Sequence, residues 1–185
     1  MQAPGITRHR RPFLAPLWVF AAVMLLAAVV LFALYRSLST TTYVIVRHAE
    51  KQLGTIADSP LAPEGEARAE RLARMLGDSE EVGAIRAIYV TDTRRTQQTA
   101  APLAARLRLT PIVVPARDVE GAIARARNEH GGSQVLLIGH SNTIPEMVEK
   151  LTGTAIPEIP EDQYGDLYVV SVPTLGPASV LRLTY

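Results

Sequence analysis

The feature that most constrains this chain is an uncharged, apolar run from Leu17 to Tyr35. At about 1.5 Å per residue, a helix of roughly 19 residues spans about 28 Å, close to the hydrocarbon thickness of a bilayer. A core helix of a small domain is rarely apolar on every face. Trp18 and Tyr35 lie near the two ends, where interfacial aromatic residues belong. Residues 17–35 are therefore predicted to form one N-terminal transmembrane helix, a signal anchor.

The charges around this run predict its orientation. Three arginines precede it and one directly follows it: Arg8, Arg10, Arg11 and Arg36. By the positive-inside rule, residues 1–16 form a basic cytoplasmic tail, and the chain beyond the helix is extracytoplasmic, or periplasmic if the cell is bacterial. The alternative is a cleaved signal peptide, for which Ser37-Leu38-Ser39 offers a weak small-x-small site.

Net charge and cysteine content exclude several classes of function. The 185 residues include 19 basic and 18 acidic side chains, a formal net charge of +1, so no general attraction to nucleic acid is expected. A phosphate-binding site would have to come from a few placed residues. The chain has no cysteine, which excludes disulfides, thiolate catalysis and cysteine-ligated zinc.

After the apolar run, short β-rich segments alternate with helical ones. A polar linker is expected over residues 36–42, followed by one catalytic domain over residues 43–185. The expected strands are 43–47, 87–91, 111–115, 135–139, 167–172 and 179–183, and the expected helices are 63–76, 93–107, 119–129 and 143–151. This order predicts an α/β fold, a three-layer sandwich with a mostly parallel central sheet and helices on both faces. The last two strands are expected to pair as an antiparallel hairpin.

Polar and cationic residues directly follow three of the predicted strands. The three segments are Arg47-His48, Asp92-Thr93-Arg94-Arg95 and His140-Ser141-Asn142. In open α/β sheets, ligands bind outside the carboxyl ends of the strands. Clustered cations repel one another and are tolerated where an anion binds. Arginines can grip phosphoryl oxygens, and a neutral imidazole can attack phosphorus without a metal.

These segments resemble motifs of the histidine phosphatase (phosphoglycerate mutase-like) superfamily. Arg47-His48-Ala49-Glu50 is similar to its Arg-His-Gly-Glu signature. Arg95 through Ala100 is similar to its Arg-x-x-x-Thr-Ala motif, and Gly139-His140-Ser141 to its third motif. Leu61-Ala62-Pro63-Glu64-Gly65 resembles a phosphate-side loop of the family. The resemblance extends over residues 43–185, and its three main motifs occur in order, each at a predicted strand end.

The resemblance implies a metal-independent phosphatase that works through a phosphohistidine and needs no cofactor. Carried over by motif, His48 is the nucleophile, and Arg47, Arg95 and His140 bind the phosphoryl group. Asn142 is a further candidate for binding the substrate.

Two residues in or beside the motifs, Arg94 and Ala49, differ from the motif positions that carry the proposed chemistry. Arg94 is expected to be a solvated or helix-capping neighbour, because Arg95 has the spacing to Thr99-Ala100. Ala49 replaces the usual glycine, and one additional methyl group is expected to cost little.

The motifs do not identify a single residue as the proton donor to the leaving group. In one branch of the superfamily an aspartate directly follows the second histidine, but Ser141 is in that place here. In the mutase-like branch a glutamate comes from the region after the second motif, which makes Asp118 and Glu120 the candidates. Both could instead be ordinary residues of a helix N-terminus. Glu50 is a third option, more suited to orienting its neighbours.

Two other kinds of chemistry fit the sequence poorly. Gly139-His140-Ser141-Asn142-Thr143 resembles the nucleophile elbow of serine hydrolases, but no histidine follows His140 to serve as the base. A metal site from His48, Glu50 and His140 would resemble zinc deaminases, whose cysteine motif this chain cannot supply.

Two functions on the same fold stay open beside the phosphatase. A non-catalytic, membrane-tethered sensor or scaffold would keep the phosphate pocket without turnover. A phosphomutase would usually need larger insertions around the pocket than these short connections provide.

The substrate is expected to be a small-molecule or lipid-linked phosphoester outside the cytoplasm. Its specificity should come from the two loops over residues 51–60 and 152–165. The second loop carries Glu158, Glu161 and Asp162, which argue against a highly anionic substrate.

Overall fold

The computed structural model describes residues 17–37, 39–54, 58–77 and 84–185, and the chain divides into two compact units, Met1–Arg36 and Ser37–Tyr185. Helix α1 (Leu17–Ser37) contains the apolar run, and none of the stretch Leu17–Tyr35 is buried. A helix of this length and composition suits a membrane span or a signal sequence. The predicted cytoplasmic tail, residues 1–16, lies outside the described residues.

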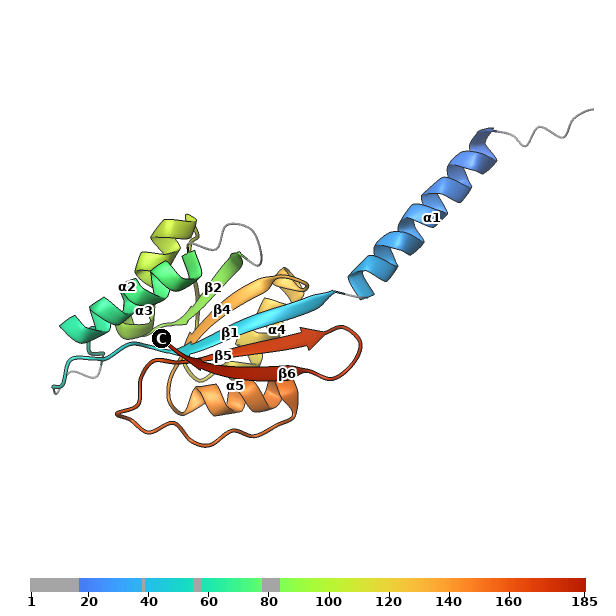
Figure 1. Cartoon of the computed structure of the whole chain (residues 1–185). Helices are drawn as coiled ribbons and strands as arrows, with labels where there is room; N and C mark the ends of the chain where they lie inside the picture. The colour runs from blue at the N-terminus through green and yellow to red at the C-terminus, as the bar shows by residue number, and fades with distance from the viewer. Residues whose placement is uncertain (1–16, 38, 55–57, 78–83) are drawn as a thin grey trace, which may run out of the picture. The chain divides into compact units, whose positions relative to one another are not determined.

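The second unit is built on a six-stranded sheet in the order β3-β2-β4-β1-β5-β6 (Figure 1). The strands are β1 (Thr40–Arg47), β2 (Ile85–Thr91), β3 (Ile112–Val114), β4 (Gln134–Gly139), β5 (Asp166–Pro173) and β6 (Ser179–Thr184). The helices are α2 (Pro63–Gly77), α3 (Arg94–Leu107), α4 (Val119–His130) and α5 (Thr143–Thr152). The first four strands pair in parallel, whereas β5 is antiparallel to both β1 and β6. The predicted α/β sandwich, with its antiparallel hairpin at the edge, is confirmed.

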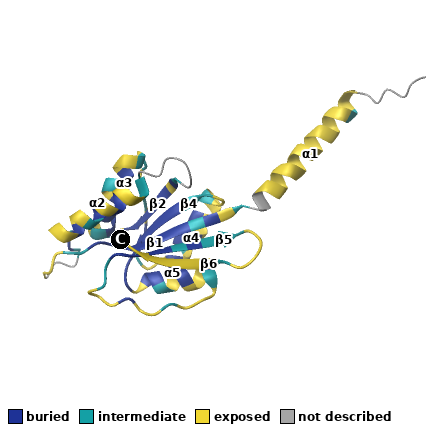
Figure 2. Cartoon of the chain, in the orientation of Figure 1, coloured by how far each residue is buried: buried dark blue, intermediate teal, exposed yellow. Residues whose placement is uncertain are grey.

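The alternation of side chains along β1 explains why helices cover both faces of the sheet. Tyr43 and Ile45 belong to a buried cluster with apolar residues of α4 and α5. Val44 and Val46 point to the other face and belong to a second cluster with residues of α2 and α3. A strand that is buried on both sides needs apolar residues at successive positions, and β1 and β4 have them (Figure 2).

Strand β1 begins three residues earlier than the sequence predicts. Thr40, Thr41 and Thr42 were expected in the linker, but they pair with Pro173, Val172 and Ser171 of β5. Threonine is β-branched and fits a pleated strand well, although its hydroxyl makes the segment read as polar. The long antiparallel partner β5 therefore extends β1 toward its N-terminal end.

The sheet order brings the three motif-bearing strands together. β4 lies between β2 and β1 and is parallel to both, with Arg47 opposite Gly139 and Val90 opposite Ile138. Their carboxyl ends consequently meet at one edge of the sheet. The residues that follow each strand come from distant parts of the chain and form a common site there.

Candidate active site

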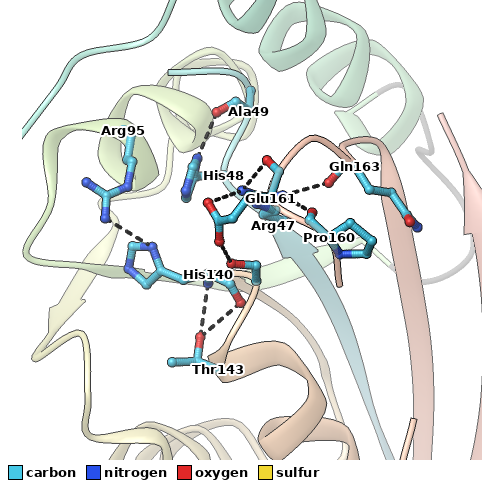
Figure 3. A network of polar contacts seen from close by, with 10 residues as sticks. Arg47, His48, Ala49, Arg95, His140, Thr143, Pro160, Glu161 and Gln163 are labelled. Atoms are coloured by element: carbon cyan, nitrogen blue, oxygen red, sulfur yellow. Dashed lines mark hydrogen bonds and ion pairs between the residues drawn. The ribbon is translucent and has the colours of Figure 1, made fainter. Parts of the chain in front are cut away.

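His48 follows β1 and is buried, with 3% of its surface exposed. Its backbone N–H donates to the carbonyl oxygen of Gly139 at 3.0 Å, which fixes the residue beside the end of β4. The ring Nδ1 lies 2.8 Å from the carbonyl oxygen of Ala49 (Figure 3). A carbonyl oxygen can only accept, so Nδ1 carries the proton and Nε2 keeps its lone pair.

The surroundings of His48 keep its ring uncharged at neutral pH. The pKa of His48 is lowered to about 3, first by burial and then by electrostatic repulsion between its protonated ring and the protonated form of His140, Arg95 and Arg47. An imidazole with this tautomer and this pKa presents an unprotonated Nε2 over the whole physiological range. Such a nitrogen is available as a nucleophile.

His140 faces His48 edge to face, with 5.3 Å between the ring centroids. Arg95 donates from Nη2 to Nδ1 of His140 at 3.4 Å, so the neutral ring carries its proton on Nε2 and donates it to Oγ1 of Thr91 at 3.1 Å. Burial, followed by the charges of Arg95 and Arg47, lowers the pKa of His140 to about 4. Both nitrogens of His140 are engaged, so His48 is the histidine with a free lone pair.

The two motif arginines each keep one buried N–H group without a partner. Nε of Arg47 and Nε of Arg95 have no hydrogen-bond partner among the described residues. A buried donor without an acceptor costs about 1–3 kcal/mol. An oxyanion bound between these groups would remove that cost through charge-assisted hydrogen bonds. Arg94 begins helix α3 and is exposed, as the motif spacing predicts.

Thr99 joins the first motif to the second. Its Oγ1 accepts from the backbone N–H of Ala49 at 3.0 Å and donates to the carbonyl oxygen of Arg95 at 2.7 Å. Ala49 itself is fully buried, and Arg108 is the one described residue other than glycine with a positive φ. Ala49 therefore does not need the left-handed backbone that favours glycine, and Thr99 fixes the segment that carries His48.

Arg47, which the motif predicts to bind the phosphoryl group, has both terminal nitrogens of its guanidinium group engaged by a loop. Nη1 donates to the carbonyl oxygens of Pro160 and Gln163, both at 2.8 Å, and Nη2 donates to the carbonyl oxygen of Glu161 at 2.9 Å. The guanidinium carbon also lies 4.2 Å from the centroid of the Tyr164 ring. In this structure Arg47 holds the loop before β5 against the end of β1, and Nε is its unpartnered donor.

Glu161 brings a carboxylate to the same place. Its Oε2 lies 3.2 Å from Nη2 of Arg47, and its Oε1 accepts a short hydrogen bond from the hydroxyl of Ser141. The hydrogen bond from Ser141, followed by the positive charges of Arg47 and Lys51, lowers the pKa of Glu161. The side chain is 73% exposed, so the carboxylate borders the buried site on its solvent side.

The proton-donor candidates taken from the sequence are engaged with other partners. Asp118 caps helix α4 by accepting from the N–H of Gly121 at 2.9 Å, and Glu120 is exposed and lies 3.6 Å from the ammonium group of Lys150. Glu50 is held by two hydrogen bonds from Nε and one from Nη2 of Arg68. Within the described part of the chain, none of the three contacts His48 or His140. Asn142 is exposed at the start of α5 without a side-chain capping bond.

A groove of about 990 Å³ opens beside the site. Its lining residues are Glu50, Lys51, Gln52, Leu53, Ala62, Glu64, Glu161, Asp162 and Tyr164. The Tyr164 ring is 6.2 Å from the ring of His48 by centroids, so the groove begins next to the nucleophile candidate. Residues from both loops expected to set specificity line the groove. Residues 55–57 of the first loop lie outside the described residues.

Comparison with known families agrees with this geometry. Residues 43–117 match the model of the histidine phosphatase superfamily (branch 1). The domain belongs to the histidine phosphatase superfamily. The matched stretch contains the first two motifs, and the third lies beyond it in the same site. No curated protein sequence matches this chain.

Solved structures share the fold of this histidine phosphatase domain. The protein histidine phosphatase SixA, solved with tungstate, is 22% identical with a TM-score of 0.64, and the match covers 77% of this chain and 96% of that one. The alpha-ribazole phosphatase from Shigella flexneri is 15% identical with a TM-score of 0.60, and coverage is 78% and 96%. A mycobacterial glucosyl-3-phosphoglycerate phosphatase is 13% identical with a TM-score of 0.61, and coverage is 76% and 97%. At these identities the likeness establishes the fold.

Four of the predicted residues meet in one place, and one participant was not anticipated. The histidine phosphatase site brings together Arg47, His48, Arg95 and His140 from three strand ends (Figure 3). Glu161 was noted in the sequence only as part of an acidic loop. The distance along the chain between it and Arg47 leaves no local spacing that could have indicated their contact.

Proposed function

We propose that this protein hydrolyses phosphomonoesters through a phosphohistidine intermediate on His48. Nε2 of His48 attacks phosphorus and displaces the alcohol, and water then releases phosphate from the nitrogen. The observation that carries the proposal is the hydrogen bond from Nδ1 of His48 to the carbonyl oxygen of Ala49. It leaves Nε2 unprotonated in a buried site, which is the requirement for a nitrogen nucleophile.

The phosphoryl group would lie between the cationic side chains that surround His48. The unpartnered Nε–H groups of Arg47 and Arg95 are suited to donate to its oxygens. The remaining contacts of Arg95 and His140 support this arrangement, because they orient the two side chains toward each other. Fixed donors of this kind stabilise the charge that spreads over the phosphoryl oxygens during transfer.

The lining of the adjacent groove supports a leaving group that is not polyanionic. Glu50, Glu64, Glu161 and Asp162 contribute acidic groups, and Lys51 is the basic residue among its described lining. The exposed side chain of Leu53 and the ring of Tyr164 add apolar surface. We therefore favour small or lipid-linked monoesters with a neutral or cationic leaving group over bisphosphates.

Turnover of a generic aryl phosphate by the purified full chain tests the proposed reaction. Wild-type protein should release phosphate from p-nitrophenyl phosphate, and His48→Ala should lose about a thousandfold or more of kcat/KM. His130→Ala is the matched control, because His130 lies at the end of α4 beside Tyr89. A protein that binds phosphate with His48 intact but never turns over would instead support the non-catalytic sensor.

We also propose that Leu17–Tyr35 anchors the protein in a membrane with the N-terminus in the cytoplasm. The length and apolar composition of α1 support a span, and the arginines that precede it support the orientation. The full chain should stay in the membrane fraction after alkaline extraction. A reporter fused to the C-terminus should work only if it is a type that is active outside the cytoplasm. Activity of a cytoplasm-only reporter would contradict the orientation, and a shortened N-terminus would show cleavage.

A further inference from the structure

The proposed reaction needs a proton donor for the leaving oxygen, and the described carboxyl groups differ in whether they can reach it. Asp118 caps α4, Glu120 faces Lys150 and Glu50 is held by Arg68. Asp92 influences His140 by its charge, but its Oδ1 accepts from the N–H of Ala116. Each of these groups is held by a contact that has no part in the transfer.

Glu161 has a different set of contacts. Its two carboxylate oxygens bridge Arg47 at the end of β1 and Ser141 at the end of β4, and it lies close enough to His48 for the two groups to interact electrostatically when the ring is protonated. It also lines the groove that begins beside His48 at Tyr164. Figure 3 shows the carboxylate among Arg47, His48 and the segment that carries His140. It therefore lies on the boundary between the buried phosphoryl site and the open groove, where the bond to the leaving group would break.

The geometry points to Glu161 as the residue that protonates the leaving group and then deprotonates the attacking water. This inference rests on the proposed phosphatase function and supplies its missing acid and base. It replaces the candidates Asp118 and Glu120.

The two half-reactions balance with Glu161 as the only proton carrier. In the first, the lone pair of His48 Nε2 forms a bond to phosphorus and the P–O bond to the alcohol breaks. The freed electron pair stays on the leaving oxygen, which takes the proton of the Glu161 carboxylic acid. In the second, the Glu161 carboxylate removes a proton from water as its oxygen bonds to phosphorus. The N–P bond then breaks, its electron pair returns to Nε2, and Glu161 is again protonated.

The charges around Glu161 suit its role as acid in the first half-reaction and as base in the second. In the empty site, Ser141 and Arg47 stabilise the carboxylate. A bound phosphoryl group brings negative charge to the same cations, and like charges close together favour protonation of the carboxyl group. A phosphomonoester also loses its second proton only at a pKa of about 6, so its monoanion can supply the proton that Glu161 uses.

The test compares two substrates that differ in their need for a proton. Nitrophenolate leaves p-nitrophenyl phosphate without protonation, whereas the alkoxide of glycerol 2-phosphate needs a proton. In the full chain, Glu161→Gln should lower kcat/KM for glycerol 2-phosphate about 100-fold or more, and for p-nitrophenyl phosphate by less than about threefold. Because kcat/KM covers steps only up to formation of the phosphoenzyme, the later role of Glu161 with water does not affect this comparison. Arg47 also donates to three backbone carbonyls of the loop, so the loop should stay in place in the variant.

Glu149→Gln provides the matched control, because Glu149 is exposed on α5 and does not line the groove. It should leave both substrates unaffected. An equal loss on both substrates in Glu161→Gln would mean that Glu161 only holds Arg47 in place, and no loss on either would also overturn the inference. Wild-type protein that turns over neither ester, with His48→Ala indistinguishable from it, would instead overturn the proposed phosphatase function.

Discussion

Nδ1 of His48 donates a hydrogen bond to the carbonyl oxygen of the very next residue, Ala49, at 2.8 Å. This short-range contact fixes both the orientation and the tautomer of the ring, because the carbonyl accepts only a protonated nitrogen. The other nitrogen is thereby assigned to the side where Arg95 and His140 lie. The proposed phosphohistidine intermediate on His48 depends on that tautomer.

The first prediction concerns the titration of His48. Its pKa of about 3 means that the imidazole should stay neutral as the pH falls well below 6.5, the ordinary value for histidine. NMR titration of ring resonances should show no change for His48 between pH 8 and about 5. A His48 ring that becomes charged near pH 6.5 would show that it is neither buried nor placed beside cations as described.

The same shifts predict how stability depends on pH. The folded-state pKa values of His48 and His140, about 3 and about 4, lie below the value of an unfolded chain. The unfolded chain therefore binds more protons, and the free energy of unfolding should decrease as the pH falls from about 6.5 toward 4. Urea unfolding at pH 7 and pH 5 measures the difference. It should shrink in His140→Asn, and an unchanged pH dependence in that variant would contradict the assignment.

The third prediction separates two adjacent arginines. Arg95→Ala removes the guanidinium that contacts His140 and the unpartnered Nε–H beside it, so kcat/KM on p-nitrophenyl phosphate should fall about 100-fold or more. Arg94→Ala removes an exposed side chain one position earlier and should change kcat/KM by less than about twofold. Equal effects of the two substitutions would show that net charge alone, and not placement, matters.

The fourth prediction concerns the hydroxyl that ties the nucleophile segment to α3. Thr99→Val leaves the buried N–H of Ala49 without its acceptor, so the free energy of unfolding should fall by about 1–3 kcal/mol. Thr99→Ser retains the hydroxyl and should retain most of the stability that valine loses. If serine and valine destabilise equally in urea unfolding, the hydrogen bond to Ala49 is not what Thr99 contributes.

A fifth prediction tests the packing of α2 against the first motif. A Cβ at Gly65 would lie 2.2 Å from the carbonyl oxygen of Glu50, so Gly65→Ala should destabilise the protein by about 1–3 kcal/mol through forced backbone movement. Gly54→Ala has nothing within 4 Å of the added carbon and should leave the unfolding midpoint nearly unchanged. A stable Gly65→Ala variant would mean that the loop and helix are not in this close contact.

The sequence predicted which residues converge where they directly follow the ends of strands. Arg47-His48, Arg95 and His140 follow apolar segments whose register in the sheet was sufficient to bring them together. Motif spacing also distinguished Arg95 from Arg94, which the structure places at the surface.

Two aspects could not be predicted, because they depend on contacts between distant loops. Glu161 reaches Arg47 from a loop without hydrophobic periodicity, so no pattern indicated its partner. The same loop takes up the Nη donors of Arg47 through backbone carbonyls, which no side-chain motif reveals. The early start of β1 was not predicted, because three consecutive threonines resemble a polar linker. In the structure they pair with β5.

Trapping the phosphorylated protein tests the central claim most directly. The full chain should be mixed with p-nitrophenyl phosphate, quenched within milliseconds in alkali and digested, and the phosphorylated residue located by mass spectrometry. The account predicts one acid-labile phosphoryl group on His48, which is absent in His48→Ala and present in His130→Ala. A phosphoryl group on another residue, or turnover that persists in His48→Ala, would contradict it.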